Sequence, residues 1–336
     1  MLVKKDVEGR NIAIDTPEKW AERRAELKSI IEFYLGEKPV FSPPPPVFHC
    51  YEENDTPDYR HLLIGYEVEP GEEVKAHLLL PPKEKRLSNA AVLCLHGTST
   101  EAKDTQMGLG QLPGRDWGRY LARRGFVTLS PDHACSGERQ PAGVKPYDSS
   151  PFYARHPRWS MMGKAIWDGE RAVDILCQLT DEVDPERIGV IGHSLGGYGS
   201  IFLAAFDSRI KVAVSSCGLT TWEGNPKRMS WARDTWYIHF PMLREIFLKD
   251  MELPFDMHEF AALIAPRAFL NISGMSDKTY AESAADLPEV GWQLYSVYNL
   301  LGAAERFAWF LFGAGHDVPN YSQALAAAWL ERWLVN

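Results

Sequence analysis

From residue 90 to the C-terminus, short apolar segments alternate with longer segments in which apolar and polar side chains recur at helical spacing. Residues 90–95 form a continuous apolar run, which is typical of a strand buried on both faces. Residues 161–180 carry polar side chains at steps of three and four, and this spacing predicts a helix. Because parallel strands are joined by crossovers that are usually helical, the alternation predicts an α/β fold: a mostly parallel central sheet with helices on both faces.

The same criteria place the other elements of this alternation. The predicted strands are residues 90–95, 126–130, 188–191, 211–215, 267–273 and 307–312, and the predicted helices are one from Trp117 to Gly125 and residues 161–180, 195–205, 292–301 and 322–334. Two stretches interrupt the pattern, a loop-like one at 136–160 and an aromatic-rich one at 219–263. Ligands of open α/β sheets bind at the carboxyl ends of the strands, so the 219–263 insertion could shape a pocket like a cap. The alternatives are an oligomer contact or a surface elaboration.

The first 60 residues follow a different pattern. Thr16 and Pro17 have the residue types of an N-cap and first helical position, and Gly36 is a stop signal, so they predict an N-terminal helix. The prolines of residues 43–46 predict a stiff connector, and residues 62–68 and 74–80 flank a Pro-Gly turn and predict a hairpin. We therefore divide the 336 residues into a helix and Pro-rich connector at 1–60 and one α/β domain at 61–336.

The net charge and the cysteine content indicate which binding partners and which cellular compartment are expected for this protein. The net charge of −9 argues against nucleic acid or an anionic membrane as a partner, and no apolar run approaches the roughly 20 residues that span a bilayer. The charged N-terminal stretch lacks the apolar region of a secretory signal, but the sequence leaves open whether a signal peptide was removed. Five scattered cysteines without a CxxC pair predict reduced thiols and a cytoplasmic protein: Cys50, Cys94, Cys135, Cys177 and Cys217. The sequence leaves a homo-oligomer open.

One short motif points to chemistry. Gly192, Ser194 and Gly196 form a G-x-S-x-G match that follows an apolar strand and opens a predicted helix. This is the context of a nucleophile elbow, in which a strained turn projects the serine hydroxyl and leaves no room for side chains two residues away. The alternative is a phosphate-binding turn, which is weaker because the segment has neither a Walker lysine nor a G-x-G-x-x-G fingerprint. We therefore predict that Ser194 is a nucleophile.

A serine hydroxyl needs a base, and among elbow-type hydrolases the acid and then the histidine follow the serine in the chain. Three histidines follow Ser194, and His239 and His258 lie in the insertion, whereas His316 lies just after the predicted strand 307–312. The end of a strand is where a base is expected, so we predict His316. A structural histidine is the alternative.

The orienting acid is expected on the loop after the preceding strand. Asp277 follows the predicted strand 267–273 by a few residues, whereas Asp286 lies further out and Asp317 is adjacent to the histidine. We predict Asp277, with a turn or helix cap as the alternative role.

The backbone N–H groups of Leu195 and Thr98 are the predicted oxyanion donors, the latter in the loop after the first buried strand. Gly97 permits that turn, and His96 is interpreted as an organiser of the loop. The residues proposed to line a pocket are His193, Trp222 and Trp236, within an aromatic group that could equally form a small core of the insertion. Asp132, His133 and Cys135 lack the distant partners of a metal site, so neither a metal nor a cofactor is predicted.

The chain resembles the α/β-hydrolase superfamily from about residue 60 to 335, most closely the branch of dienelactone hydrolase-like and acetyl xylan esterase-like enzymes. The motifs that carry this resemblance are His96-Gly97, Pro131-Asp132, Ser136-Gly-Glu-Arg139, Trp167-Asp168, Asp184-Pro-Glu-Arg187, the Gly192 to Gly197 elbow and Gly315-His316. The resemblance implies an α/β-hydrolase fold and the triad Ser194, Asp277 and His316. Dienelactone hydrolases carry cysteine at the Ser194 position, and glucuronoyl esterase-like members carry arginine at the Leu195 position.

The sequence therefore predicts a cofactor-free serine esterase that acts on a small or medium carboxylic ester, such as an acetyl ester or a lactone. One alternative is an amidase or peptidase with the same triad. Another is a non-catalytic binding module on a hydrolase scaffold, against which the complete triad argues.

Overall fold

The sheet of the computed structural model runs in the order β11-β10-β9-β8-β6-β7-β5-β4-β3, and the structure describes all residues except 6–7, 9, 111 and 280–286. Strands β11 to β7 are parallel in this order, and β5, β4 and β3 continue the sheet antiparallel. The strand bounds are β3 Phe48–Asp55, β4 Arg60–Glu69, β5 Glu72–Leu80, β6 Ala91–Leu95, β7 Val127–Pro131, β8 Ile188–His193, β9 Ile210–Ser216, β10 Ala268–Gly274 and β11 Phe307–Phe312. The predicted sheet is confirmed.

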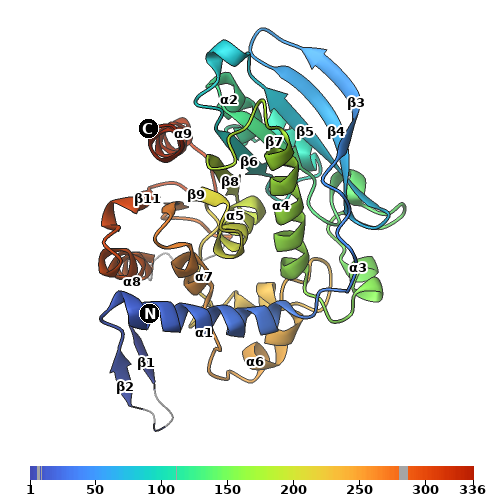
Figure 1. Cartoon of the computed structure of the whole chain (residues 1–336). Coiled ribbons are helices and arrows are strands. Elements are labelled where there is room, and N and C mark those ends of the chain that lie inside the picture. The colour runs from blue at the N-terminus through green and yellow to red at the C-terminus, as the bar shows by residue number, and fades with distance from the viewer. Residues whose placement is uncertain (6–7, 9, 111, 280–286) are drawn as a thin grey trace.

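Helices cover both faces of the sheet (Figure 1). The bounds are α1 Pro17–Leu35, α2 Trp117–Arg123, α3 Ser150–Arg155, α4 Met161–Gln178, α5 Leu195–Phe206, α6 Arg244–Leu248, α7 Met257–Ile264, α8 Leu287–Leu300 and α9 Asn320–Leu334. Successive strand residues point to opposite faces, so Leu93 packs in the core with α4 and α5, whereas Val92 packs in the core with α2 and α9. No helix in the described ranges is both long and apolar enough to cross a bilayer.

The N-terminal region differs in part from the prediction. α1 begins after Thr16, whose side chain accepts a hydrogen bond from the Lys19 N–H, and it ends at Gly36 in a left-handed conformation, as expected. Residues 1–60 are not only a helix and connector, because β3 pairs with β4 and forms the edge of the main sheet. β3 alternates poorly and is mostly exposed, so its sequence lacks the apolar period that marks the other strands. A small hairpin, β1 Val3–Lys5 and β2 Asn11–Ala13, precedes α1.

The polar stripe of α4 is buried in part. The Lys164 ammonium lies 2.5 Å from Glu69 and 2.8 Å from Asp168, and its side chain is fully inaccessible. Arg139, from the loop after β7, pairs with Asp168 at 2.7 Å and is almost fully buried. Buried charges are tolerated when they are paired, so these ion pairs fix the 136–160 loop against α4 and the β4–β5 hairpin.

The insertion between β9 and β10 packs its aromatic side chains inward. Trp222, Phe240 and Phe255 lie within 6.4 Å of one another, centroid to centroid, and Phe202 of α5 contacts Phe240 and Phe260. The aromatic side chains of the insertion therefore pack against one another and extend the main hydrophobic core over α5 (Figure 1).

Candidate active site

Ser194 stands in a strained turn between β8 and α5. Its φ of 57° and ψ of −115° lie outside the regions that L-residues ordinarily adopt. A Cβ on Gly196 would lie 2.0 Å from the Leu95 carbonyl oxygen, and one on Gly192 would lie 2.4 Å from Gly196. Both positions therefore require glycine, and the turn has the geometry that a nucleophile elbow demands.

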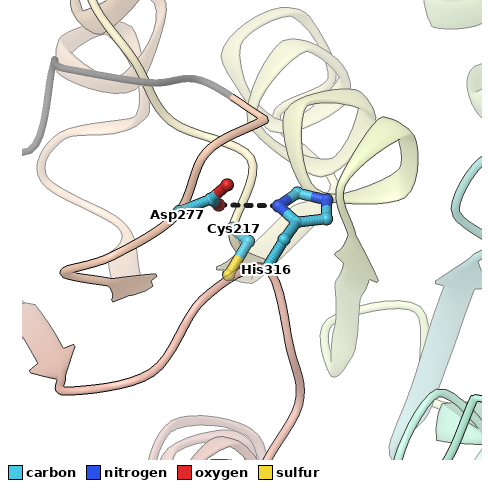
Figure 2. Close-up of side chains that lie close together, drawn as sticks. All are labelled: Cys217, Asp277 and His316. Carbon is cyan, nitrogen blue, oxygen red and sulfur yellow. Dashed lines mark hydrogen bonds and ion pairs between the residues drawn. The ribbon is translucent and has the colours of Figure 1, made fainter.

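His316 and Asp277 meet on the loops that follow β11 and β10 (Figure 2). The Nδ1 atom of His316 lies 2.6 Å from Oδ2 of Asp277, and the other carboxylate oxygen accepts the Thr279 N–H at 2.8 Å. Backbone bonds join the two loops, since the Met275 N–H donates to the Phe312 carbonyl at 2.8 Å. The carboxylate thus holds the imidazole in one orientation and favours a proton on Nδ1.

The imidazole of His316 lies beside the elbow. Its ring centroid is 4.7 Å from that of His193, the residue before Ser194. The other two histidines that follow the serine belong to the insertion: His239 Nε2 bonds the Tyr198 hydroxyl at 2.7 Å, and His258 lies beside Asp256. Of the other acids considered, Asp317 is exposed and Asp286 lies outside the described residues. The structure therefore brings the predicted serine, histidine and acid to one edge of the sheet.

The loop after β6 passes directly against the nucleophile. A Cβ on Gly97 would lie 3.7 Å from Ser194 Cβ and 3.1 Å from the His193 carbonyl oxygen. His96 Nδ1 donates to the Gly97 carbonyl at 2.7 Å, and its Nε2 accepts the His133 N–H at 3.1 Å. These are the contacts of a loop organiser. They fix the course of the chain into Thr98, the predicted oxyanion donor, which is exposed.

Tyr147 also holds this loop, and the sequence did not point to it. Its hydroxyl accepts the Ser99 N–H at 2.8 Å and lies 2.8 Å from the Ser99 carbonyl and 3.4 Å from that of Gly97. Burial raises the pKa of Tyr147 to about 12, so it remains a neutral donor. It lies in the 136–160 stretch, where neither periodicity nor a motif distinguishes it.

Cys217 is a second neighbour of the site that the sequence did not single out. It follows β9 in a left-handed conformation, with φ of 48°, and its thiol lies close to the His316–Asp277 pair (Figure 2). Burial raises the pKa of this thiol to about 12. Cys217 is therefore a protonated thiol near neutral pH and a poor nucleophile.

The predicted pocket residues are not all where a ligand could touch them. Trp222 is fully buried in the aromatic core of the insertion, so the core interpretation holds for it and the pocket interpretation is wrong. Trp236 is 41% exposed and donates through Nε1 to the Pro146 carbonyl. His193 is buried between Ser216 and His316. A sequence pattern cannot separate the inner from the outer aromatic side chains of an irregular insertion.

The Asp132–Cys135 segment is a structural loop. The carboxylate of Asp132 accepts the Lys103 and Glu138 N–H groups and pairs with the Lys103 ammonium at 3.2 Å. His133 Nε2 lies 3.0 Å from the His96 carbonyl. The Asp132 carboxylate and one ring nitrogen of His133 are thus engaged in contacts within the protein.

Four of the buried histidines make stability depend on pH: His96, His133, His193 and His239. Burial lowers the pKa of each, to about 4 for His96 and about 3 for His239. The unfolded chain binds these protons near pH 6.5 and the folded chain does not, so stability is lost as the pH falls below 6.5. We expect each histidine to lower the free energy of unfolding by about 1 kcal/mol between pH 7.5 and 5.5. Urea denaturation at both pH values measures this loss, and equal stabilities would contradict it.

Part of this chain matches a known family model, and the chain is similar in sequence to known proteins. Residues 147–302 match the family model "Glucuronyl esterase, fungi". A putative hydrolase, YtaP, of Bacillus subtilis is 28% identical over 94% of this chain and 99% of its own length. A 4-O-methyl-glucuronoyl methylesterase of Podospora anserina is 30% identical over 47% of this chain, which spans a third (33%) of that protein.

The fold also has close solved counterparts. The glucuronoyl esterase from Solibacter usitatus superposes with a TM-score of 0.73 at 18% identity, covering 98% of this chain and 96% of that one. At this identity the superposition supports the fold, while the sequence relatives are named as hydrolases and esterases. The elbow, the sheet and these comparisons together show that the chain has the α/β-hydrolase fold and is similar to proteins named as hydrolases and esterases.

Proposed function

We propose that this esterase works through an acyl-enzyme, with Ser194 as nucleophile, His316 as base and Asp277 as the acid that orients the base. The observation that carries the proposal is the 2.6 Å contact between His316 Nδ1 and Asp277 Oδ2 on loops next to the elbow. With a proton on Nδ1, Nε2 of the same neutral ring is unprotonated and can therefore act as the base that takes the serine proton.

In the first half of the reaction, Ser194 Oγ attacks the ester carbonyl carbon while His316 Nε2 takes the hydroxyl proton. The negative charge that develops on the carbonyl oxygen is stabilised by the N–H groups of Leu195 and Thr98. Asp277 stabilises the imidazolium that forms. Collapse of the intermediate expels the alcohol, which leaves with the proton from His316.

In the second half, water enters and His316 removes its proton as the water oxygen attacks the acyl carbon. The same two N–H groups stabilise the second tetrahedral intermediate. The carboxylic acid departs and Ser194 recovers its proton. No cofactor enters either half of this scheme.

We propose a small carbohydrate ester as substrate, with the methyl ester of a uronic acid first and an acetylated sugar second. The support is the family match over residues 147–302 and the names of the relatives. Leu195 stands where glucuronoyl esterase-like proteins carry arginine, so the oxyanion would be held by backbone N–H groups alone.

A substrate panel tests this assignment. Methyl glucuronate, acetylated xylose, nitrophenyl esters of increasing acyl length and a matched nitroanilide are compared by kcat/KM, each beside Ser194→Ala. We expect the methyl uronate to be hydrolysed with the highest kcat/KM and the anilide with the lowest. A preference for the nitroanilide would replace the proposal with amide hydrolysis.

Tyr147→Phe tests whether the Tyr147 hydroxyl holds the loop after β6, which carries the proposed oxyanion donor Thr98 and is termed the oxyanion loop. The variant leaves the Ser99 N–H without its partner, which costs about 1–2 kcal/mol and is expected to lower kcat by about 5- to 30-fold. KM should change little because Tyr147 acts through the loop. Tyr153→Phe is a matched control, since that hydroxyl also joins two backbone groups, those of Ile238 and Met161. Equal losses of kcat in both variants would contradict a specific role.

A further inference from the structure

Three different donor atoms converge at the acid and the base of the proposed triad. The Cys217 sulfur, a carboxylate oxygen of Asp277 and a ring nitrogen of His316 all lie within 4.8 Å of one another (Figure 2). They come from the ends of β9, β10 and β11, which are neighbours in the sheet. Thiolate, imidazole and carboxylate are the donor types that Zn²⁺ binds in proteins, with three protein ligands and one open position in many sites.

The spacing is close to that of a metal site. Zinc–ligand distances of about 2.0 to 2.3 Å in a tetrahedron place the donor atoms roughly 3.3 to 3.7 Å apart. The Asp277–His316 contact of 2.6 Å would have to open by about 1 Å. The Cys217 sulfur lies within 4.8 Å of both ligand atoms, so it would have to approach them by at most about 1 Å. The nitrogen that faces Asp277 is Nδ1, so this atom would be the ligand.

The surrounding backbone holds the three loops in place. The Cys217 N–H donates to the Ile272 carbonyl at 2.7 Å, which ties its loop to β10. The Ser276 N–H donates to the Ala314 carbonyl at 3.1 Å, which ties the Asp277 loop to the His316 loop. The carboxylate and the imidazole are partly accessible, whereas the thiol lies beneath them. An ion could therefore enter from the solvent side and meet the sulfur below.

We propose that Cys217, Asp277 and His316 form an inhibitory binding site for a thiophilic divalent cation, with Zn²⁺ as the ion of matching chemistry. On binding, the Cys217 thiol releases one proton to solvent and gives up its contact with the Asp317 carbonyl. The Nδ1 proton of His316 is replaced by the ion, and the ring carries its proton on Nε2 instead. Nε2 then cannot accept the proton of Ser194. Inhibition rests on the proposed triad, but metal binding does not.

Co²⁺ absorption tests the site without any catalytic readout. The metal-free chain titrated with Co²⁺ is expected to bind one ion with a thiolate-to-cobalt charge-transfer band and the visible bands of a tetrahedral site. Cys217→Ser and Cys217→Ala should lose the charge-transfer band, and circular dichroism checks that both variants fold. Cys50→Ser is the matched control, because Cys50 is an exposed thiol next to His49, and it should keep the band. A band that is absent in the wild type, or that survives in Cys217→Ser, overturns the proposal.

Zn²⁺ titration of ester hydrolysis tests the inhibition. Each variant is scaled to its own metal-free rate. The wild type should be inhibited and recover with a chelator. Loss of a direct ligand should raise the half-inhibitory concentration in Cys217→Ser by at least about tenfold. Equal inhibition of both proteins contradicts the site. A Co²⁺ band in a chain without esterase activity would refute the proposed function and leave the metal site standing.

Discussion

Ser194→Ala is expected to lower kcat on the best ester by about 10⁴- to 10⁶-fold, with KM nearly unchanged. The geometry of the elbow explains why this loss is expected to be large. Ser194 is held at φ 57° between two glycines that admit no side chain, so the backbone fixes its position at the tip of the turn. Removal of the hydroxyl leaves the oxyanion donors and the binding surface intact, which accounts for the residual rate.

Initial-rate kinetics with the purified variant measures this loss. Ser208→Ala is the control, since Ser208 is an exposed serine in the turn after α5, and its rate should match the wild type. A loss smaller than tenfold in Ser194→Ala on a genuine substrate would falsify the nucleophile assignment.

Asp277→Asn should lower kcat by about 10⁴-fold, or roughly 5 kcal/mol of transition-state stabilisation. The carboxylate oxygen 2.6 Å from His316 Nδ1 accepts a hydrogen bond from Nδ1–H and so keeps Nε2 unprotonated. An asparagine can present its N–H to Nδ1 instead, which moves the ring proton to Nε2 and blocks proton transfer from Ser194. The imidazolium would also lose its stabilising negative charge.

The neighbouring Asp317→Asn is the matched control, since its side chain is exposed and one residue from the same histidine. It should retain most of the wild-type kcat. If Asp277→Asn and Asp317→Asn lower kcat equally, Asp277 is not the orienting acid.

Much of this architecture could be predicted from the sequence, because local patterns carry it. The buried parallel strands are continuous apolar runs, and the elbow is a tight turn that allows only glycine around Ser194. Chain order and position just after a predicted strand together selected His316 and Asp277, and the ends of these two strands lie at the same edge of the sheet. The cytoplasmic location and the oligomeric state stay predictions.

The remaining features depend on contacts between distant segments. β3 is mostly exposed and could be recognised only by its pairing with β4. Tyr147 reaches the oxyanion loop from about 50 residues away in the chain, and Cys217 meets His316 only because β9 and β11 flank β10. The buried ion pairs of α4 have the sequence pattern of a solvated helix face. Composition and residue spacing do not predict these contacts, because the partners are far apart in the sequence.

The central claim is that Ser194 is activated by His316 and Asp277, and a fluorophosphonate probe tests it most directly. The folded chain is treated with the probe, digested, and mapped by mass spectrometry, beside Ser194→Ala and Asp277→Asn. We predict one phosphonylated residue, Ser194, with no labelling in Ser194→Ala and much slower labelling in Asp277→Asn. Labelling of a different residue, or none in a chain that hydrolyses esters, would contradict the account.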